Sequence, residues 1–126
     1  MRSIGKVMIV DDSSTSRMII QRCMEIAGAR VGEYLYAENG LDALARLRSG
    51  GGIDLVITDI NMPKMDGKTF AAILRGEESS AQIEIVVVSS IADSALEAEL
   101  RALGVLSIVK KPVSPAKMRQ ALEGAE

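Results

Sequence analysis

Residues 6–15 read KVMIVDDSST. An apolar run long enough for a short buried strand passes directly into two adjacent aspartates and then into hydroxyl residues that favour a helix start. Adjacent carboxylates repel each other, so their place at the end of a strand is costly unless a positive group lies between them. This stretch therefore predicts a strand, a helix and an acidic site where the two elements meet.

Four further runs are predicted to be strands. Residues 53–59 and 83–89 are continuous and rich in Val and Ile, which favours parallel strands covered on both faces. Residues 107–111 are predicted to form another buried strand. Residues 33–38 (EYLYAE) alternate more and are predicted to form an edge strand.

Amphipathic helical patterns alternate with these strands, and most of them end at glycine. They cover residues 14–27, 40–48, 67–75, 94–103 and 114–123. Strands that alternate with helices predict a (βα)5 α/β domain, in which helices cover both faces of a doubly wound parallel sheet. We expect one domain over residues 1–126, with its site at the carboxyl edge of the sheet.

Composition narrows the classes of function. The chain has 126 residues and a net charge of -2, so it lacks the basic surface by which proteins bind nucleic acid non-specifically. It contains no histidine, which removes the usual general base and the commonest metal ligand. Aromatic residues make up 2%, which leaves little for stacking a flavin or a base.

The chain carries no pattern for export or membrane insertion. Its apolar N-terminal run is short and leads into aspartates without a cleavage pattern, and no run reaches the length of a membrane span. The single cysteine, Cys23, cannot form an internal disulfide and lies on the apolar face of a predicted helix. These features predict a cytoplasmic protein.

The predicted strand ends carry chemically specific side chains. Because parallel strands place their carboxyl ends along one edge of the sheet, these side chains are expected to converge in a shallow pocket. They are Asp11 and Asp12 after the first strand, Asp59 after the third, Ser89 and Ser90 after the fourth, and Lys110 and Lys111 after the fifth.

Each of these residues also has a structural explanation when it is taken alone. Asp12 could cap the following helix, and Asp59 could be a turn residue before Pro63. Ser89 could bond locally at its strand end, and Lys111 could be a solvated lysine at a sheet edge. Four such residues at successive strand ends favour a functional interpretation.

Clustered carboxylates without imidazole suit a hard cation, and Mg²⁺ is favoured because it accepts few protein ligands and keeps several waters. A carboxylate beside such a cation can attack a phosphoryl group and form an aspartyl phosphate. Phosphoryl transfer requires positioning and charge neutralisation more than acid–base groups. Mg²⁺, the Lys111 ammonium, the Ser89 hydroxyl and backbone N–H groups can provide both without histidine.

Together these motifs resemble the receiver domain of bacterial response regulators, of the chemotaxis CheY-like type. The resemblance covers the whole chain through VMIVDDSSTSR (7–17), LVITDINMPKMDG (55–67), IVVVSS (85–90) and IVKKP (108–112). It implies a flavodoxin-like three-layer sandwich whose five parallel strands have the order 2-1-3-4-5.

The resemblance also implies a role for each acidic residue. Asp59 matches the phosphoacceptor. Asp12 matches a direct Mg²⁺ ligand, and Asp11 would act on the metal through bound water. Asn61, two residues after Asp59, would offer its backbone carbonyl to the metal.

Two further residues match the part of the family pattern that couples phosphorylation to conformation. Ser89 matches the switch hydroxyl, and Lys111, which precedes Pro112, matches the site lysine. The family often has an aromatic residue three positions before this lysine, where this chain has Ile108. We therefore expect coupling through the loop after Ser89 and through aliphatic packing of Ile91 and Ile108.

The function implied by the resemblance is a phosphorelay switch and not a metabolic enzyme. Such a switch takes its phosphoryl group from a sensor histidine kinase or a small phosphodonor and hydrolyses it, sometimes with the help of a phosphatase. Its protein target is expected to bind the face formed by the fourth helix, fifth strand and fifth helix. The expected role is a stand-alone regulator in chemotaxis or motility; the alternative is a domain cut from a longer protein.

Three rival interpretations remain open at this point. A small Mg²⁺-dependent aspartyl-phosphate phosphohydrolase of the haloacid dehalogenase type would want aspartates spaced D-x-D, whereas Asp11 and Asp12 are adjacent. A flavin carrier would want a phosphate-binding loop where this chain has DDSSTSR. A receiver that switches without phosphate would keep the same residues.

Overall fold

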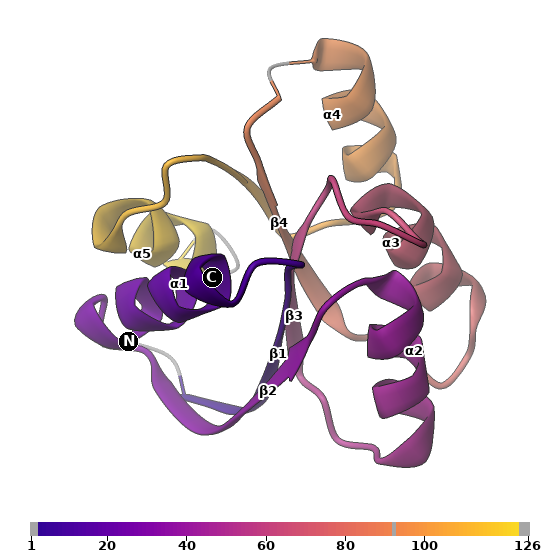
Figure 1. Cartoon of the computed structure of the whole chain (residues 1–126), viewed down its shortest axis with the longest axis horizontal. Coiled ribbons are helices and arrows are strands. Elements are labelled where there is room, and N and C mark those ends of the chain that lie inside the picture. The colour runs from indigo at the N-terminus through magenta and orange to yellow at the C-terminus, as the bar shows by residue number, and fades with distance from the viewer. Residues whose placement is uncertain (1–2, 92, 124–126) are drawn as a thin grey trace.

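The structure is a computed structural model that describes residues 3–91 and 93–123. Within these ranges, strands and helices alternate along the chain as predicted (Figure 1). The elements are β1 (Ser3–Val10), α1 (Ser14–Ile26), β2 (Arg30–Ala37), α2 (Gly40–Ser49), β3 (Leu55–Asp59), α3 (Gly67–Gly76), β4 (Glu84–Ser89), α4 (Ser94–Ala102), β5 (Ser107–Lys110) and α5 (Pro115–Glu123).

The strands form one parallel sheet in the order β2-β1-β3-β4-β5. Figure 1 views the sheet nearly edge-on, with α1 and α5 on one face and α2, α3 and α4 on the other. The predicted fold class and strand order are therefore confirmed. The chain passes from β1 to the edge strand β2, then crosses to β3 and continues to the other edge, so the switch point lies between β1 and β3.

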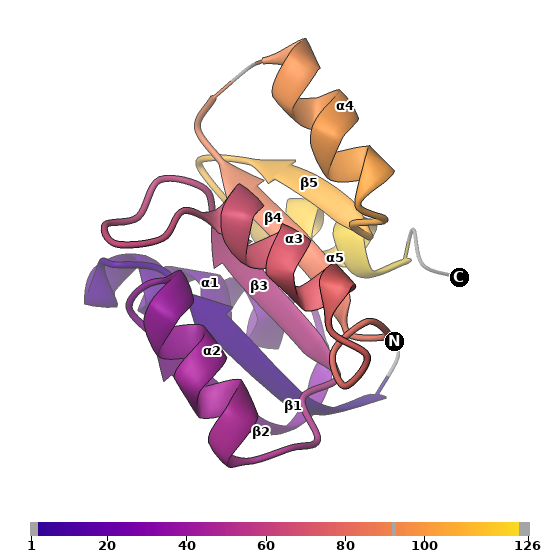
Figure 2. The ribbon, with the colours of Figure 1, turned by 90° about the vertical axis from the view of Figure 1, so that its right-hand side faces the viewer.

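The sheet separates two hydrophobic clusters. Side chains of β1 and β3 alternate between them: Val7, Ile9 and Ile57 face α1 and α5, while Met8 and Val56 face α2 and α3. Every residue of β3 is buried, which explains its apolar run Leu55–Ile57 before the polar residues Thr58 and Asp59. Figure 2 shows α2 and α3 lying across one of these two faces.

The two edge strands differ from expectation in different ways. The edge position of β2 is confirmed. This strand starts at Arg30, earlier than predicted, because its pairing with β1 continues back to Ser3. The prediction that the last strand is buried is wrong. β5 has a single strand neighbour, so Ile108 is half-buried and Lys110 is exposed.

Short polar side chains fix the helix starts. Ser13 caps α1, Asn39 caps α2, Asp66 caps α3 and Asp93 caps α4, each by accepting a backbone N–H of the first turn. Asp12 therefore does not cap α1 and is left for another role. Among the described residues, no helix combines the length and apolar character needed to cross a bilayer.

Candidate functional site

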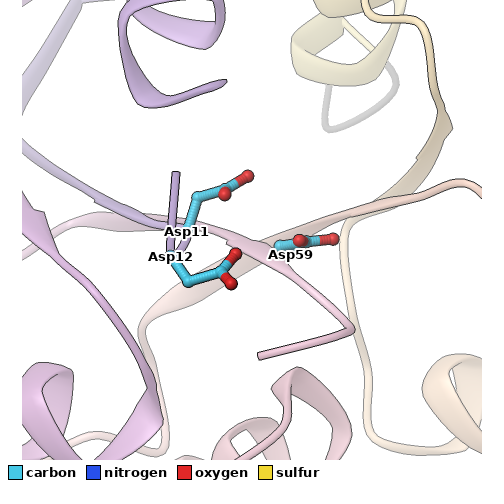
Figure 3. A group of neighbouring side chains, drawn as sticks. All are labelled: Asp11, Asp12 and Asp59. Atoms are coloured by element: carbon cyan, nitrogen blue, oxygen red, sulfur yellow. The ribbon is translucent and has the colours of Figure 1, made fainter. Parts of the chain in front are cut away.

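The candidate site lies at the carboxyl edge of the sheet, where β1 and β3 end side by side. Figure 3 shows the Asp11 and Asp12 side chains extending from the end of β1 toward Asp59 at the end of β3. Val10 pairs with Thr58, so the sheet register itself brings the acidic residues together. One carboxylate oxygen from each of the three lies within 4.8 Å of the others.

Asp59 is a buried carboxylate beside a cation. Its side chain is 10% exposed, and its Oδ2 lies 3.5 Å from Lys111 Nζ. Its Oδ1 accepts the Ile60 backbone N–H at 2.8 Å. Burial raises the pKa of Asp59, Lys111 opposes that rise, and the neighbouring Asp11 adds to it.

Asp11 is almost completely buried and is held by the start of α1. Its Oδ1 accepts the Ser13 backbone N–H at 2.9 Å, and its Oδ2 accepts the Ser16 hydroxyl at 2.7 Å. Its backbone carbonyl accepts Arg17 Nη1 at 2.6 Å. Lys111 Nζ lies 3.6 Å from the same Oδ2. Both carboxylate oxygens therefore already have protein partners.

Asp12 has the opposite environment. It is exposed, and within residues 3–91 and 93–123 its carboxylate has no hydrogen bond or ion pair. It is therefore the carboxylate that is freest to take a new partner at this edge.

The acidic cluster has the chemistry and dimensions that Mg²⁺ requires. All three donors are carboxylate oxygens, the ligand class that Mg²⁺ prefers. Two oxygens on opposite sides of one Mg²⁺ lie about 4.2 Å apart, since each bond is about 2.1 Å long. The 4.8 Å span is close to this value, so small side-chain movements suffice for ligation or for bridging by water. The residues therefore fit the ion.

Lys111 supplies positive charge to Asp11 and Asp59, two of the three carboxylates of the cluster. Its ammonium lies between Asp11 and Asp59, and its side chain is 30% exposed. Its backbone N–H bonds the Ser89 carbonyl at 2.9 Å, which fixes its position at the end of β5. The Lys111–Pro112 peptide bond is cis.

Ser89 lies at the end of β4, as predicted, but its hydroxyl is used locally. Ser89 is 2% exposed, and its Oγ accepts the Ile91 backbone N–H at 3.0 Å. Asn61 lies exposed in the loop after β3. The structure therefore gathers Asp11, Asp12, Asp59 and Lys111 into one cluster, while the Ser89 hydroxyl faces its own loop.

The loop between β3 and α3 closes tightly against the site. The Gly67 N–H bonds the Ile60 carbonyl at 2.9 Å. A Cβ at Gly67 would lie only 2.1 Å from the Asp59 carbonyl oxygen, so only glycine fits there. Met62 and Met65 are half-buried and pack against the core on this side.

Sequence reasoning missed the residues that hold Asp11. The hydroxyl of Ser16 and the guanidinium of Arg17 both turn back from the first turn of α1 toward the strand end. Spacing shows only that side chains in the first turn of a helix can reach back to the preceding strand; it does not show which of them does so.

Comparison of the sequence with known protein families identifies the family to which this chain belongs. Residues 7–123 match the response regulator receiver domain. The chain belongs to this family. As a receiver domain it carries its acidic cluster at the edge where the strands end, and membership favours the receiver interpretation over the phosphohydrolase and flavin-carrier alternatives.

Several relatives resemble this receiver domain over most of its length. It is 30% identical over 118 residues to the chemotaxis protein CheY1 of Helicobacter pylori, and the match covers 94% of each protein. It is 41% identical over 85 residues to the sensor histidine kinase CheAY of the same species, which covers 67% of this chain and 10% of the kinase.

A solved structure gives the same comparison in three dimensions. The chemotaxis response regulator CheY4 of Vibrio cholerae superposes with a TM-score of 0.80 at 27% identity. The superposition covers 98% of this chain and 99% of that one. The whole described fold, and not the sheet alone, is therefore shared. The boundaries of the domain at residues 1 and 126 stay a prediction.

Proposed function

We propose that this receiver domain is a phosphorylation-dependent switch with Asp59 as the phosphoacceptor. The observation that carries the proposal is the position of Lys111 Nζ, 3.5 Å from Asp59 Oδ2 and 3.6 Å from Asp11 Oδ2, beside three carboxylates within 4.8 Å. A buried nucleophile, a cation and an oxygen-rich cluster meet there at the edge where α/β sheets bind ligands.

The proposed chemistry follows from these contacts. An Asp59 carboxylate oxygen forms the new bond to phosphorus, while the bond from phosphorus to the donor breaks and its electron pair leaves with the donor. Ile60 N–H orients Asp59 by holding Oδ1. Lys111, fixed through Ser89, offers positive charge to the transferred phosphoryl oxygens.

We assign the metal ligands from the freedom of each oxygen. Asp12 and Asp59 would bind Mg²⁺ directly together with the Asn61 backbone carbonyl, and Asp11 would act through bound water. Asp12 is exposed and has no partner among the described residues, whereas both oxygens of Asp11 accept hydrogen bonds, and these facts support this division. When bound, Mg²⁺ neutralises carboxylate repulsion and the negative charge that builds up on the phosphoryl oxygens.

The switching step is proposed to begin at Ser89. Its Oγ now accepts the Ile91 N–H. Rotation of the side chain to donate its O–H to a phosphoryl oxygen on Asp59 would move Oγ away from this N–H. Release of Ile91 would free the loop that leads into α4. Leu100 is the one buried residue of α4, so this helix is lightly attached (Figure 2). Ile108, half-buried in the same hydrophobic cluster, would transmit the movement by packing.

Partners are proposed from the relatives and from the exposed face. A sensor histidine kinase is the proposed donor, and chemotaxis or motility is the proposed pathway, since relatives are named as CheY proteins and as a CheA-type kinase. The target would bind the α4–β5–α5 face, where a groove of about 240 Å³ runs between β5 and α5. A phosphatase is a further proposed partner.

We place the protein in the cytoplasm because its lone cysteine is unpaired.

The proposal is tested by incubating the protein with a small acyl phosphate and Mg²⁺. Intact-protein mass spectrometry is expected to detect one added phosphoryl group. No phosphoryl group should be added when the labelling reaction is run with Mg²⁺ chelated. Asp12→Ala should lose most labelling even when Mg²⁺ is present. Equal labelling with and without Mg²⁺ would contradict the metal role, and absence of labelling under all conditions would contradict the proposed function.

A further inference from the structure

The first turn of α1 restrains Asp11 much more tightly than its neighbour Asp12. Asp11 is 1% exposed and receives hydrogen bonds from the Ser13 N–H, the Ser16 hydroxyl and the Arg17 guanidinium. Asp12, one residue later, is exposed and has no such partner in the described chain. The helix that follows these two adjacent carboxylates therefore restrains the side chain of Asp11 and leaves that of Asp12 free to move.

The Ser16 hydroxyl bears directly on the carboxylate oxygen that faces the site. It bonds Asp11 Oδ2, the same oxygen that lies 3.6 Å from Lys111 Nζ. A bond of 2.7 Å from a hydroxyl to a carboxylate is a strong, charge-assisted hydrogen bond. Oδ2 has two lone pairs, and it already faces both this hydroxyl and the Lys111 ammonium, so direct binding of a metal would displace one of these partners while Asp11 remains almost fully buried.

We infer that Ser16 is a positioning residue that keeps Asp11 out of the inner coordination shell of Mg²⁺. This inference rests on the proposed function, since it concerns the same cation site. Mg²⁺ demands near-octahedral coordination and keeps several waters. By restraining Asp11, Ser16 leaves one position at the ion for water or for a phosphoryl oxygen.

Removal of the hydroxyl gives opposite changes in binding and in chemistry. In Ser16→Ala, Asp11 Oδ2 is free to become a third direct carboxylate ligand, so Mg²⁺ affinity rises by roughly tenfold, since affinity increases with the number of charged ligands. At saturating Mg²⁺, phosphorylation slows by roughly tenfold, because the extra carboxylate takes the position that orients the phosphoryl group. A merely structural role for Ser16 would lower both together.

The experiment is a calorimetric Mg²⁺ titration of the wild type and of variants at this turn, paired with labelling rates at saturating Mg²⁺. Ser16→Thr keeps the hydroxyl and should restore wild-type affinity and rate. Ser14→Ala is the matched control, because Ser14 is exposed on the same turn and bonds nothing in the described chain. Ser16→Cys, which keeps the volume but donates weakly, replaces Ser16→Ala if that variant does not fold.

The inference is overturned if Ser16→Ala binds Mg²⁺ no more tightly than the wild type, or if Ser16→Thr behaves like Ser16→Ala. It is also overturned if the wild type binds no Mg²⁺. Its failure is separable from that of the proposed function. If the wild type is labelled but Ser16→Ala gains no Mg²⁺ affinity, only the role of Ser16 is refuted. If Ser16→Ala gains Mg²⁺ affinity but the wild type is not labelled, only the assignment of the phosphoacceptor is refuted.

Discussion

Neutralising Asp59 should stabilise the protein when divalent cations are absent. Asp59 is buried, and loss of solvent raises its pKa despite the Lys111 ammonium, so the ionised side chain opposes folding. Asp59→Asn keeps the shape and keeps an oxygen to accept the Ile60 N–H, but removes the charge. We therefore expect the free energy of unfolding to rise in a chelating buffer at neutral pH.

The magnitude follows from the distances in the cluster. At an effective dielectric constant of 20, the Asp11 and Asp59 carboxylate oxygens, taken at the 4.8 Å limit of the cluster, repel by about 3.5 kcal/mol, and the exposed Asp12 adds a smaller repulsion that solvent screens. On the same scale Lys111 Nζ, 3.5 Å from Asp59 Oδ2, attracts it by about 4.7 kcal/mol, which its 30% exposure reduces. These charge terms nearly cancel, and the cost of burying a carboxylate decides the sign. The net gain is expected to be on the order of 1 kcal/mol.

Mg²⁺ should reverse this ranking. A cation that binds only the folded state adds about 2.7 kcal/mol at a concentration 100 times its Kd. The wild type should gain this amount, and Asp59→Asn, which lacks one ligand charge, should gain less. Urea unfolding, followed by far-ultraviolet circular dichroism, measures the free energy of unfolding of the wild type and of Asp59→Asn, each with Mg²⁺ and with chelator. Glu78→Gln, an exposed residue without a partner in the described chain, controls for loss of one negative charge.

The pH dependence gives an independent check of the sign. Unfolded Asp59 ionises near its ordinary pKa of 3.8, and folded Asp59 ionises at a higher pH. The advantage of the neutral side chain is therefore present in the wild type below pH 3.8 and is lost as pH rises through the folded pKa. The free energy of unfolding of Asp59→Asn should therefore exceed that of the wild type by an increasing amount as pH rises from 3.8 through the folded pKa of Asp59. A variant less stable than wild type in chelator at neutral pH would refute the reasoning.

Three other predictions concern residues around the cluster. Lys111→Met should slow acyl-phosphate labelling by about 100-fold, because the phosphoryl oxygens lose their fixed cation; retained Mg²⁺ binding by calorimetry would separate this from loss of the metal site. Ile108→Ala should weaken phosphorylation-dependent binding of a target more than it changes the labelling rate, and unchanged phosphorylation-dependent binding would rule out coupling through this side chain. Arg75→Met should lower the free energy of unfolding by about 1–3 kcal/mol, measured by urea, because the Arg75 guanidinium bonds carbonyls both before β4 and in the α4–β5 turn.

The fold was largely predictable from the sequence because strand burial leaves a strong pattern. The continuous Val and Ile runs of β3 and β4 arise from helices on both faces of the sheet, and they gave the parallel architecture directly. The strand order came from resemblance to a family and not from the pattern. The exposure of β5 was missed, because a short apolar run reads the same at a sheet edge as at its centre.

The candidate site was predictable in its members but not in its contacts. Strand ends of a parallel sheet must meet, so the convergence of Asp11, Asp59 and Lys111 followed from topology. The hydrogen bond from Ser16 to Asp11 depends on side-chain direction in the first helical turn, and the local bond from Ile91 to Ser89 depends on loop geometry. Neither is encoded in residue spacing alone. The roles assigned to these residues stay predictions.

The most direct test of the central proposal is to identify the phosphorylated residue chemically. The protein is labelled with a small acyl phosphate and Mg²⁺, the acyl phosphate is reduced with borohydride, and the modified peptide is sequenced by mass spectrometry. The reduced aspartyl phosphate is expected at Asp59 and is expected to be absent from Asp59→Asn. Modification at another residue of the wild type, or equal labelling of Asp59→Asn, would contradict the assignment of Asp59 as phosphoacceptor.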